Sequence, residues 1–307
     1  MASRASSHQR LEPLRHVEAG VLDIAYYEAG PADGPVAMLL HGYPYDIHSY
    51  VDVVPQLAAN SVRVIVPYLR GYGQTRFLDP ATPRSGEQAA IGADLMALMD
   101  ALAIPRAVFA GYDWGGRAAC VGAALWPGRC MGLVSVNGYL IQDIANAHVP
   151  VRPERELALW YQWYFQIERG RAGLAANRRA ITKMLWQQWS PNWRFDEATL
   201  ERTSRAHDNP DFVDVVIHSY RHRYGLAAGD PRYAEIQRRL DPLPPISVPS
   251  ITLDGDADGV SPATDGRASA AKFLGPRTHR VIPGAGHDLP QEEPQAFAAA
   301  VLELIGG

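Results

Sequence analysis

Short apolar runs alternate with longer segments of helical spacing through the first 140 residues, and this alternation constrains the fold more than any other feature. Four of the runs are typical of buried strands: 36–40, 62–66, 107–110 and 131–136. Apolar residues at helical spacing cover 91–102, after a capping-box pattern at 85–88. A segment rich in small residues at 115–126 suits a helix packed closely on a sheet. Strands that alternate with helices form a parallel sheet with helices on both faces, so we predict an α/β fold.

The alternation stops near residue 140 and resumes near residue 246. The chain between these points is rich in arginine and aromatic residues and has helical spacing, and it holds five of the seven tryptophans: Trp160, Trp163, Trp186, Trp189 and Trp193. Strand signals return at 251–253 and 279–282, and the last helix is predicted to begin near Pro294. We therefore predict a core domain of residues 14–140 and 246–307, an inserted helical cap domain of residues 141–245 and a flexible N-terminus of residues 1–13.

Charge and composition exclude several classes of protein. Lys and Arg together number 29 and Asp and Glu 33, a net charge of -4, whereas a general binder of nucleic acid or anionic membrane should be basic. Cys120 and Cys130 cannot form a disulfide framework, and no signal peptide or membrane-spanning run is apparent. His218 and His222 have the spacing of a metal pair but lack a third ligand, so we expect neither metal nor cofactor. We expect a cytoplasmic protein with no nucleic-acid or membrane partner, and a homo-oligomer stays possible.

The motif Gly111-Tyr-Asp-Trp-Gly115 comes directly after a predicted strand and opens a predicted helix. Glycines two residues to each side of a central residue allow a sharp strand-to-helix turn that pushes the central side chain into a cleft. The usual central residue is a serine nucleophile, and here it is Asp113. The alternative interpretation is an aspartate that merely caps the helix.

A second loop supplies what such a nucleophile needs. His41-Gly-Tyr-Pro44 follows the strand at 36–40, at the place that contributes one backbone N–H to the oxyanion hole of this architecture. The residue after the nucleophile contributes the other N–H. The expected pair is therefore Tyr43 and Trp114.

Two more loops, each after its own strand, carry a carboxylate and a histidine. Asp258 follows the strand at 251–253, with Asp254 and Asp256 as competing carboxylates. His287 stands in a glycine-rich turn after the next strand. The chain order of nucleophile, acid and histidine matches the order of the triad in this architecture.

Taken with these motifs, the chain resembles enzymes of the α/β-hydrolase fold, in particular the branch with an aspartate nucleophile: epoxide hydrolases and haloalkane or haloacetate dehalogenases. The resemblance covers nearly the whole chain. It rests on His41-Gly-Tyr-Pro44, Leu69-Arg-Gly-Tyr-Gly73, Gly111-Tyr-Asp-Trp-Gly115 and Gly284-Ala-Gly-His287. It implies that Asp258 is the triad acid, because Asp258 fills the last place of the family's Gly-x-x-Asp pattern. It also implies that residues 141–245 form a cap over the active site.

An aspartate at the nucleophile position indicates displacement at a saturated carbon. A serine attacking such a carbon would leave an ether, whereas a carboxylate leaves an ester that can be cleaved at its carboxyl carbon. His287 would act as general base on water, oriented by Asp258. The two oxyanion-hole amides would stabilise the tetrahedral intermediate formed on Asp113.

The leaving group separates the two main hypotheses. Epoxide opening needs an acid that protonates the developing alkoxide, and phenols suit that task. Tyr161 lies in a segment that resembles the first tyrosine motif of epoxide hydrolase caps, and Tyr220 in one that resembles the second. Plain helix packing is the alternative for both. We expect an epoxide hydrolase that acts on a small hydrophobic molecule and water.

Dehalogenation is the principal alternative. Trp114 resembles the halide-binding tryptophan of haloalkane dehalogenases, but Tyr43 stands where their second halide ligand is often Asn or Glu. Trp163 matches half of the His-Trp halide pair of haloacetate dehalogenases, and Arg117 matches one of their substrate-binding arginines. A third hypothesis is a non-catalytic binding protein of the same fold, against which the intact triad counts.

Overall fold

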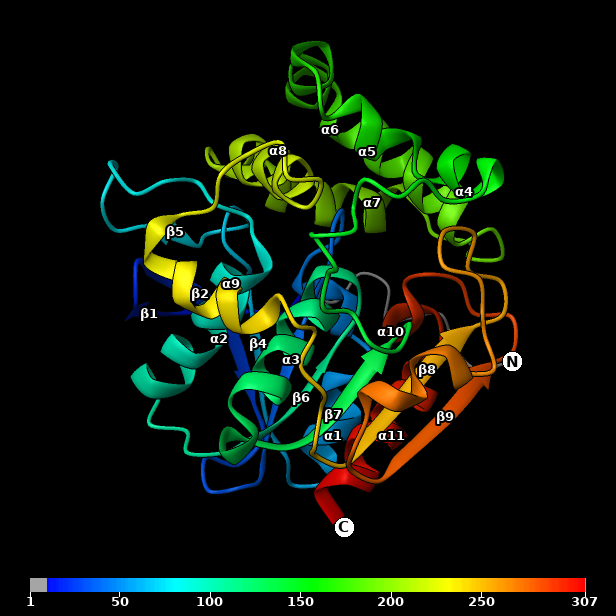
Figure 1. Cartoon of the computed structure of the whole chain (residues 1–307). Helices are drawn as coiled ribbons and strands as arrows, with labels where there is room; N and C mark the ends of the chain where they lie inside the picture. Colours follow the sequence, from blue (N-terminus) through cyan, green and yellow to red (C-terminus); the bar gives the residue numbers. More distant parts are fainter. Residues whose placement is uncertain (1–9, 307) are drawn as a thin grey trace.

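The computed structural model describes residues 10–306 (Figure 1). Most of the predicted flexible N-terminus, residues 1–9, lies outside the described residues. Of the remaining residues in that range, Leu11 is buried against the core. No helix in the described range is long and apolar enough to cross a membrane.

A single twisted sheet forms the centre of the core. Its strands run in the order β1-β2-β4-β3-β6-β7-β8-β9, and β5 pairs with the free part of β2. The strands are β1 (Arg15–Ala19), β2 (Leu22–Ala29), β3 (Val36–Leu40), β4 (Arg63–Pro67), β5 (Arg76–Phe77), β6 (Ala107–Gly111), β7 (Cys130–Val136), β8 (Ser250–Gly255) and β9 (Arg277–Ile282). The six predicted strands are confirmed, and they pair in parallel in the sheet order β4-β3-β6-β7-β8-β9. The pattern of apolar runs does not indicate β1, β2 and β5, which pair antiparallel at one edge.

Helices cover both faces of the sheet, as predicted (Figure 1). One layer consists of α1 (Val54–Ala59) and α11 (Pro294–Gly306), and the other of α2 (Gln88–Ala101), α3 (Asp113–Leu125) and α9 (Ala234–Leu240). The capping box predicted at 85–88 does not form. Ser85 Oγ instead donates a hydrogen bond to the Glu87 carboxylate at 2.8 Å, and Glu87 is the N-cap of α2.

The segment between β7 and α9 is helical and lies above the carboxyl ends of the parallel strands (Figure 1). Its helices are α4 (Pro153–Ala158), α5 (Trp160–Tyr164), α6 (Glu168–Trp189), α7 (Glu197–Ser204) and α8 (Phe212–His222). Short helices complete the fold: η1 (Ile47–Tyr50), η2 (Pro127–Arg129), η3 (Arg205–Asp208), η4 (Pro231–Tyr233), η5 (Arg267–Lys272) and α10 (Leu289–Glu292). α9 falls within the range predicted for the cap but packs on α2 and α3 of the core.

Candidate active site

The turn from β6 into α3 presents Asp113 at the carboxyl end of the sheet. Asp113 has a φ of 49°, which is strained for a residue with a side chain. The glycines are required by close approach, because a Cβ on Gly115 would lie 1.9 Å from Leu40 O. The N-cap of α3 is Tyr112 and no side chain caps the helix, so Asp113 is not there to cap it.

The loop after β3 binds the Asp113 carboxylate. Tyr43 N–H donates to Asp113 Oδ1 at 2.8 Å, from the position predicted for an oxyanion-hole donor. The loop is held by His41, whose Nε2 accepts from Leu69 N–H at 3.1 Å. Burial lowers the pKa of His41 to about 4, so the ring is neutral and can accept this bond. The role of the Trp114 backbone N–H as the second donor of the oxyanion hole stays a prediction.

His287 lies between two carboxylates. Its Nδ1 is 2.8 Å from Asp258 Oδ2, and its Nε2 is 3.7 Å from Asp113 Oδ2. Asp258 Oδ1 accepts hydrogen bonds from Val260 N–H at 2.8 Å and Ser261 N–H at 2.7 Å. These backbone donors fix the carboxylate so that its other oxygen faces the imidazole.

The contacts of His287 with the two carboxylates also set the protonation states of His287 and Asp113. Burial alone would lower the pKa of His287, but the carboxylates of Asp258 and Asp113 outweigh it and raise that pKa to about 10. Burial would likewise raise the pKa of Asp113, but the contact with His287 lowers it below its ordinary value. The resting site therefore holds a carboxylate nucleophile beside an imidazolium.

Asp254 and Asp256, the other two candidates for the triad acid, accept hydrogen bonds from groups other than His287. Asp254 Oδ2 accepts from the backbone N–H and the hydroxyl of Thr264, at 2.9 and 3.0 Å. Asp256 Oδ1 accepts from Gly284 N–H at 2.6 Å. Of the three, Asp258 is the one that reaches His287.

The two predicted acids meet over the nucleophile loop. The rings of Tyr161 and Tyr220 lie 5.3 Å apart between centroids, and they lie 6.3 and 5.5 Å from the ring of Tyr43. Both are buried, Tyr161 from α5 and Tyr220 from α8. Burial raises the pKa of Tyr161 to about 12, an effect that the Arg223 guanidinium partly offsets, so the phenol keeps its proton at neutral pH.

Gln162 leaves that proton available. Gln162 Nε2 donates to Tyr161 Oη at 2.8 Å, while Gln162 Oε1 accepts from Tyr224 Oη at 2.8 Å and from Arg223 Nη1 at 3.5 Å. These two donors fix which end of the amide is the oxygen. Because Tyr161 accepts from Gln162, its own O–H can be donated to another group.

Several buried polar atoms around Asp113 have no hydrogen-bond partner among the described residues. Buried polar groups normally find partners, so such a concentration is typical of a site where substrate and water supply them. The atoms are Tyr43 Oη, Tyr72 Oη, Trp114 Nε1, Trp189 Nε1, Tyr220 Oη and His287 Nε2.

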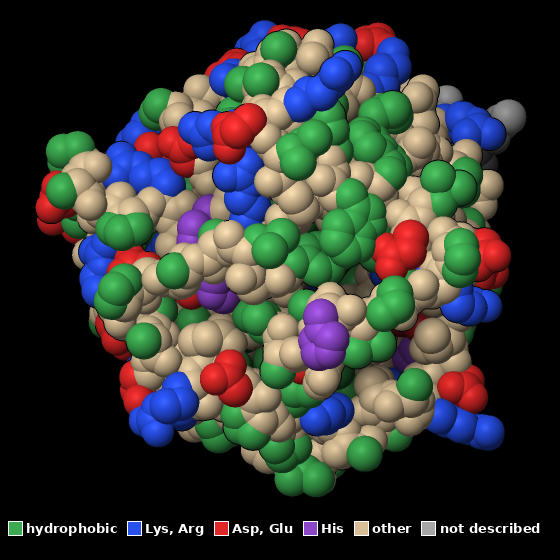
Figure 2. Space-filling model, turned by 45° about the horizontal axis from the view of Figure 1, so that its top comes forward, with side chains coloured by type: hydrophobic (Ala, Val, Ile, Leu, Met, Phe, Trp, Pro, Cys, Tyr) green, Lys and Arg blue, Asp and Glu red, His purple; other side chains and the backbone are tan. Residues whose placement is uncertain are grey.

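Trp163 is not brought to this site. Its side chain is 42% exposed, its Nε1 donates to Glu156 Oε2 at 2.9 Å, and its ring packs on Tyr224. Figure 2 shows the molecule turned so that the cap comes toward the viewer. Apolar side chains gather there among charged ones. Trp163 is one of the exposed apolar residues of the cap, together with Leu157. It therefore offers no N–H to a group bound at Asp113.

Trp189 and Ser190, at the end of α6, contact His287, although no sequence motif pointed to either of them. The Trp189 ring lies 5.2 Å from that of His287, and Trp189 O accepts from His287 N–H at 3.2 Å. Ser190 Oγ accepts from His287 N–H at 3.0 Å and donates to Glu292 at 2.6 Å. The cap thus holds the histidine loop directly. The tryptophan cluster was the available signal, but it did not single out Trp189.

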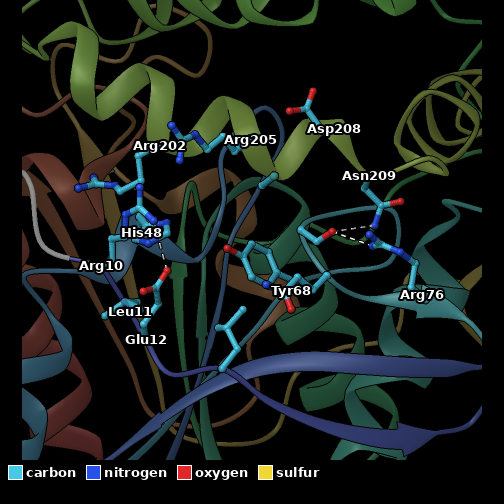
Figure 3. A pocket seen from close by; sticks show the side chains of 14 residues that line it. Arg10, Leu11, Glu12, His48, Tyr68, Arg76, Arg202, Arg205, Asp208 and Asn209 are labelled. Carbon is cyan, nitrogen blue, oxygen red and sulfur yellow. Dashed lines mark hydrogen bonds and ion pairs between the residues drawn. The ribbon is translucent and has the colours of Figure 1, made fainter.

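Figure 3 shows a separate cavity, of about 310 Å³. None of the candidate site residues lines this cavity. Its lining includes four arginines: Arg10, Arg76, Arg202 and Arg205. The two histidines with the spacing of a metal pair bind other groups. His218 Nδ1 accepts from Gly86 N–H, and His222 Nε2 lies 3.2 Å from Glu87 Oε2. The described residues contain no group of three or more side chains that could hold a metal ion.

Comparison with known proteins identifies the family. The α/β hydrolase fold family matches residues 35–294, and the chain belongs to that family. A crystal structure of a putative epoxide hydrolase from Klebsiella pneumoniae is 49% identical, covers 96% of this chain and 97% of its own, and superposes with a TM-score of 0.94. Epoxide hydrolase A of Mycobacterium tuberculosis is 27% identical over 95% of this chain and 97% of its own length. The magnesium-chelatase 30 kDa subunit of Rhodobacter capsulatus is 28% identical over 94% of this chain and 93% of its own.

Proposed function

We propose that this chain is an epoxide hydrolase that opens epoxides to diols through an ester on Asp113. The observation that carries the proposal is the pair of buried phenols, Tyr161 and Tyr220, that face the nucleophile loop. Tyr220 Oη has no hydrogen-bond partner among the described residues, and Tyr161 Oη accepts from Gln162 Nε2. An epoxide needs an acid at the departing oxygen, whereas a halide does not. The names of the similar proteins from Klebsiella pneumoniae and Mycobacterium tuberculosis support the same activity.

In the first step the Asp113 carboxylate attacks a carbon of the epoxide, and the C–O bond of the ring breaks. The developing alkoxide takes a proton from Tyr161 or Tyr220. The hydrogen bond from Tyr43 to Oδ1 leaves Oδ2, on the His287 side, as the attacking oxygen. The strained φ of Asp113 holds the carboxylate in this orientation before substrate arrives.

In the second step water attacks the carboxyl carbon of the ester. An ester carries no charge, so alkylation of Asp113 removes one of the two carboxylates that raise the pKa of His287. This favours transfer of the imidazolium proton through solvent to the phenolate that the first step leaves. The neutral ring then takes a proton from the attacking water and gives it to the departing diol oxygen as the ester C–O bond breaks. Asp258 orients that ring, and Tyr43 N–H stabilises the oxyanion that forms on Asp113.

Dehalogenation is the second candidate function, and one observation favours it. The indole N–H groups of Trp114 and Trp189 are buried and have no hydrogen-bond partner among residues 10–306. The Trp114 ring packs against Tyr43 and the Trp189 ring against His287. Two such donors could stabilise a departing halide. Trp163, on which the sequence-based alternative also relied, does not contribute.

A paired assay separates the candidates. Diol formation and halide release are measured over a small panel of terminal epoxides, chloroalkanes and chloroacetate. Diol formation supports the proposal, and halide release without any epoxide opening would contradict it. The non-catalytic hypothesis predicts that Asp113→Ala keeps ligand binding and loses no reaction. The cytoplasmic location and the oligomeric state remain proposals to test separately.

A further inference from the structure

The end of α6 joins the cap to two loops of the core: the acid loop, which follows β8 and carries Asp258, and the histidine loop, which follows β9 and carries His287. Trp189 O accepts a hydrogen bond from His287 N–H at 3.2 Å. The same carbonyl accepts from Gly259 N–H, next to Asp258, at 3.0 Å. One carbonyl of the cap therefore binds both loops.

Ser190 makes a second contact with the histidine loop. Its Oγ accepts from His287 N–H at 3.0 Å and from Asp288 N–H at 3.4 Å. Its O–H donates to Glu292 Oε1 at 2.6 Å, and Glu292 Oε2 accepts from Gly286 N–H at 2.8 Å. Ser190 is only 1% exposed, so these bonds are shielded from solvent.

Glu292 sets the direction of the Ser190 hydroxyl. A hydroxyl group has one proton to donate and two lone pairs that accept. Because the proton points at the Glu292 carboxylate, the lone pairs remain for the backbone N–H groups of His287 and Asp288. Without the carboxylate the proton could turn toward the histidine loop, where it would meet two other donors. Ser190 and Glu292 therefore act as one unit.

Glycines in both loops make this close approach possible. A Cβ on Gly286 would lie 2.5 Å from Ser190 Cα, and a Cβ on Gly259 would lie 2.0 Å from Gln188 O. Neither contact can be accommodated without a shift of the backbone. Both loops thus pack directly on the backbone at the end of α6, and their positions depend on it.

We propose that Ser190 is a positioning residue for His287 and that Glu292 acts through Ser190. To activate the water that cleaves the ester, His287 must keep Nδ1 on Asp258 and Nε2 toward Asp113, at 2.8 and 3.7 Å. Ser190 binds the backbone that carries this ring, so its loss would widen the range of positions that Nε2 occupies. The inference rests on the proposed function and gives the cap a part in its second step.

The test measures the two half-reactions separately. Ser190→Ala leaves His287 N–H its bond to Trp189 O, so the variant should fold. In a single turnover quenched with acid, loss of epoxide reports formation of the ester and appearance of diol reports its hydrolysis. Hydrolysis should slow by about 10- to 100-fold, because a misplacement of about 1 Å can cost that much, and the ester should accumulate as added protein mass. Formation of the ester should keep its wild-type rate, since Ser190 touches neither Asp113 nor the phenols.

Glu292→Gln tests whether the two residues act together. One carboxylate oxygen becomes an NH₂ group, so one of the two bonds, to Ser190 O–H or to Gly286 N–H, is lost. This variant should slow the same step. The double variant, Ser190→Ala with Glu292→Gln, should hydrolyse the ester no more slowly than the slower single variant, because members of one unit are not additive.

Asn192→Ala is the matched control. Asn192 Nδ2 donates to Gly284 O at 3.1 Å, which is another bond between the cap and the turn that leads to His287, but it does not touch His287. A variant that only loosens the attachment of the cap should therefore change neither rate.

Each outcome decides between the inference and the proposed function. In a folded Ser190→Ala, checked by thermal unfolding, unchanged hydrolysis or equal slowing of both steps overturns the inference, while turnover by the wild type leaves the proposed function standing. The same slowing of hydrolysis in Asn192→Ala also overturns it. If Ser190→Ala does not fold, the two rates in Glu292→Gln decide the question. A wild-type chain that forms neither ester nor diol contradicts the proposed function itself.

Discussion

Replacing Asp258 with asparagine should stop the reaction after its first half. The side chain keeps its shape, but its two ends are no longer equivalent. The Oδ1 position receives N–H groups from Val260 and Ser261 at 2.8 and 2.7 Å, so the amide oxygen belongs there. The amide NH₂ then takes the Oδ2 position, 2.8 Å from His287 Nδ1, and donates to that nitrogen.

This orientation places the histidine in the wrong tautomer. Turning the amide over would set its NH₂ against two backbone donors, whereas the first orientation sets it against one longer bond, from Asn137 Nδ2 at 3.3 Å. Each unsatisfied buried donor costs about 1–3 kcal/mol, so the first orientation is favoured. His287 would therefore carry its proton on Nε2, where it must accept one from water. The equivalent change in Ser-His-Asp triads lowers turnover on the order of 10⁴-fold, and we expect a loss of that size in ester hydrolysis.

Alkylation needs Asp113 and the phenols rather than a basic histidine, so it should survive. Rapid mixing of Asp258→Asn with an epoxide, followed by acid quenching and measurement of the intact protein mass, should show an accumulating adduct. The matched control is Asp256→Asn, because an amide oxygen can still accept the bond from Gly284 N–H. Steady-state turnover of Asp258→Asn within tenfold of wild type, or an equal loss in Asp256→Asn, would refute the reasoning.

Three further changes test other parts of the account. Tyr161→Phe removes a proton donor and should lower kcat/KM for epoxides by about 10²–10⁴-fold, measured by diol formation; an unchanged value would remove Tyr161 from the mechanism. The raised pKa of His287, about 10 against 6.5, means that its ion pairs stabilise the fold fully below about pH 6.5 and lose that contribution, at most about 5 kcal/mol, as pH rises through 10. Wild type should thus lose more unfolding free energy than His287→Gln between pH 6.5 and 10, and equal losses would contradict this. Gly115→Ala should destabilise the fold by about 3 kcal/mol or more in urea, because its Cβ meets Leu40 O at 1.9 Å, whereas Gly128→Ala, with open space around it, should change stability by under about 0.5 kcal/mol.

The sequence predicted the parts of the fold and site that are encoded locally. The strands β3 and β6 are apolar throughout and buried throughout, so the pattern of apolar runs identifies them. The strand-to-helix turn at Asp113 is predictable because only glycine tolerates such close approach at Gly115. The acid and histidine loops follow β8 and β9, and because these strands run parallel both loops lie at the same edge of the sheet.

What the sequence could not supply is the direction in which a side chain points. Tyr161 and Trp163 lie two residues apart on α5, and a helix turns them to different faces: one is buried over the nucleophile and the other is exposed. The part played by Glu292 was also hidden. It ends α10, just before the last helix, and its carboxylate accepts from Gly286 N–H nearby in the chain. It also accepts from Ser190 Oγ of the cap, a contact between distant segments that no local pattern indicates.

The central claim is that the oxygen transferred to the substrate comes from Asp113 and not from water. A single turnover with enzyme in excess over an epoxide, carried out in ¹⁸O-labelled water, tests this directly. The account predicts that the first diol carries no label, that the label enters the Asp113 carboxylate, and that later turnovers release labelled diol. A diol that is already fully labelled in the first turnover would contradict it.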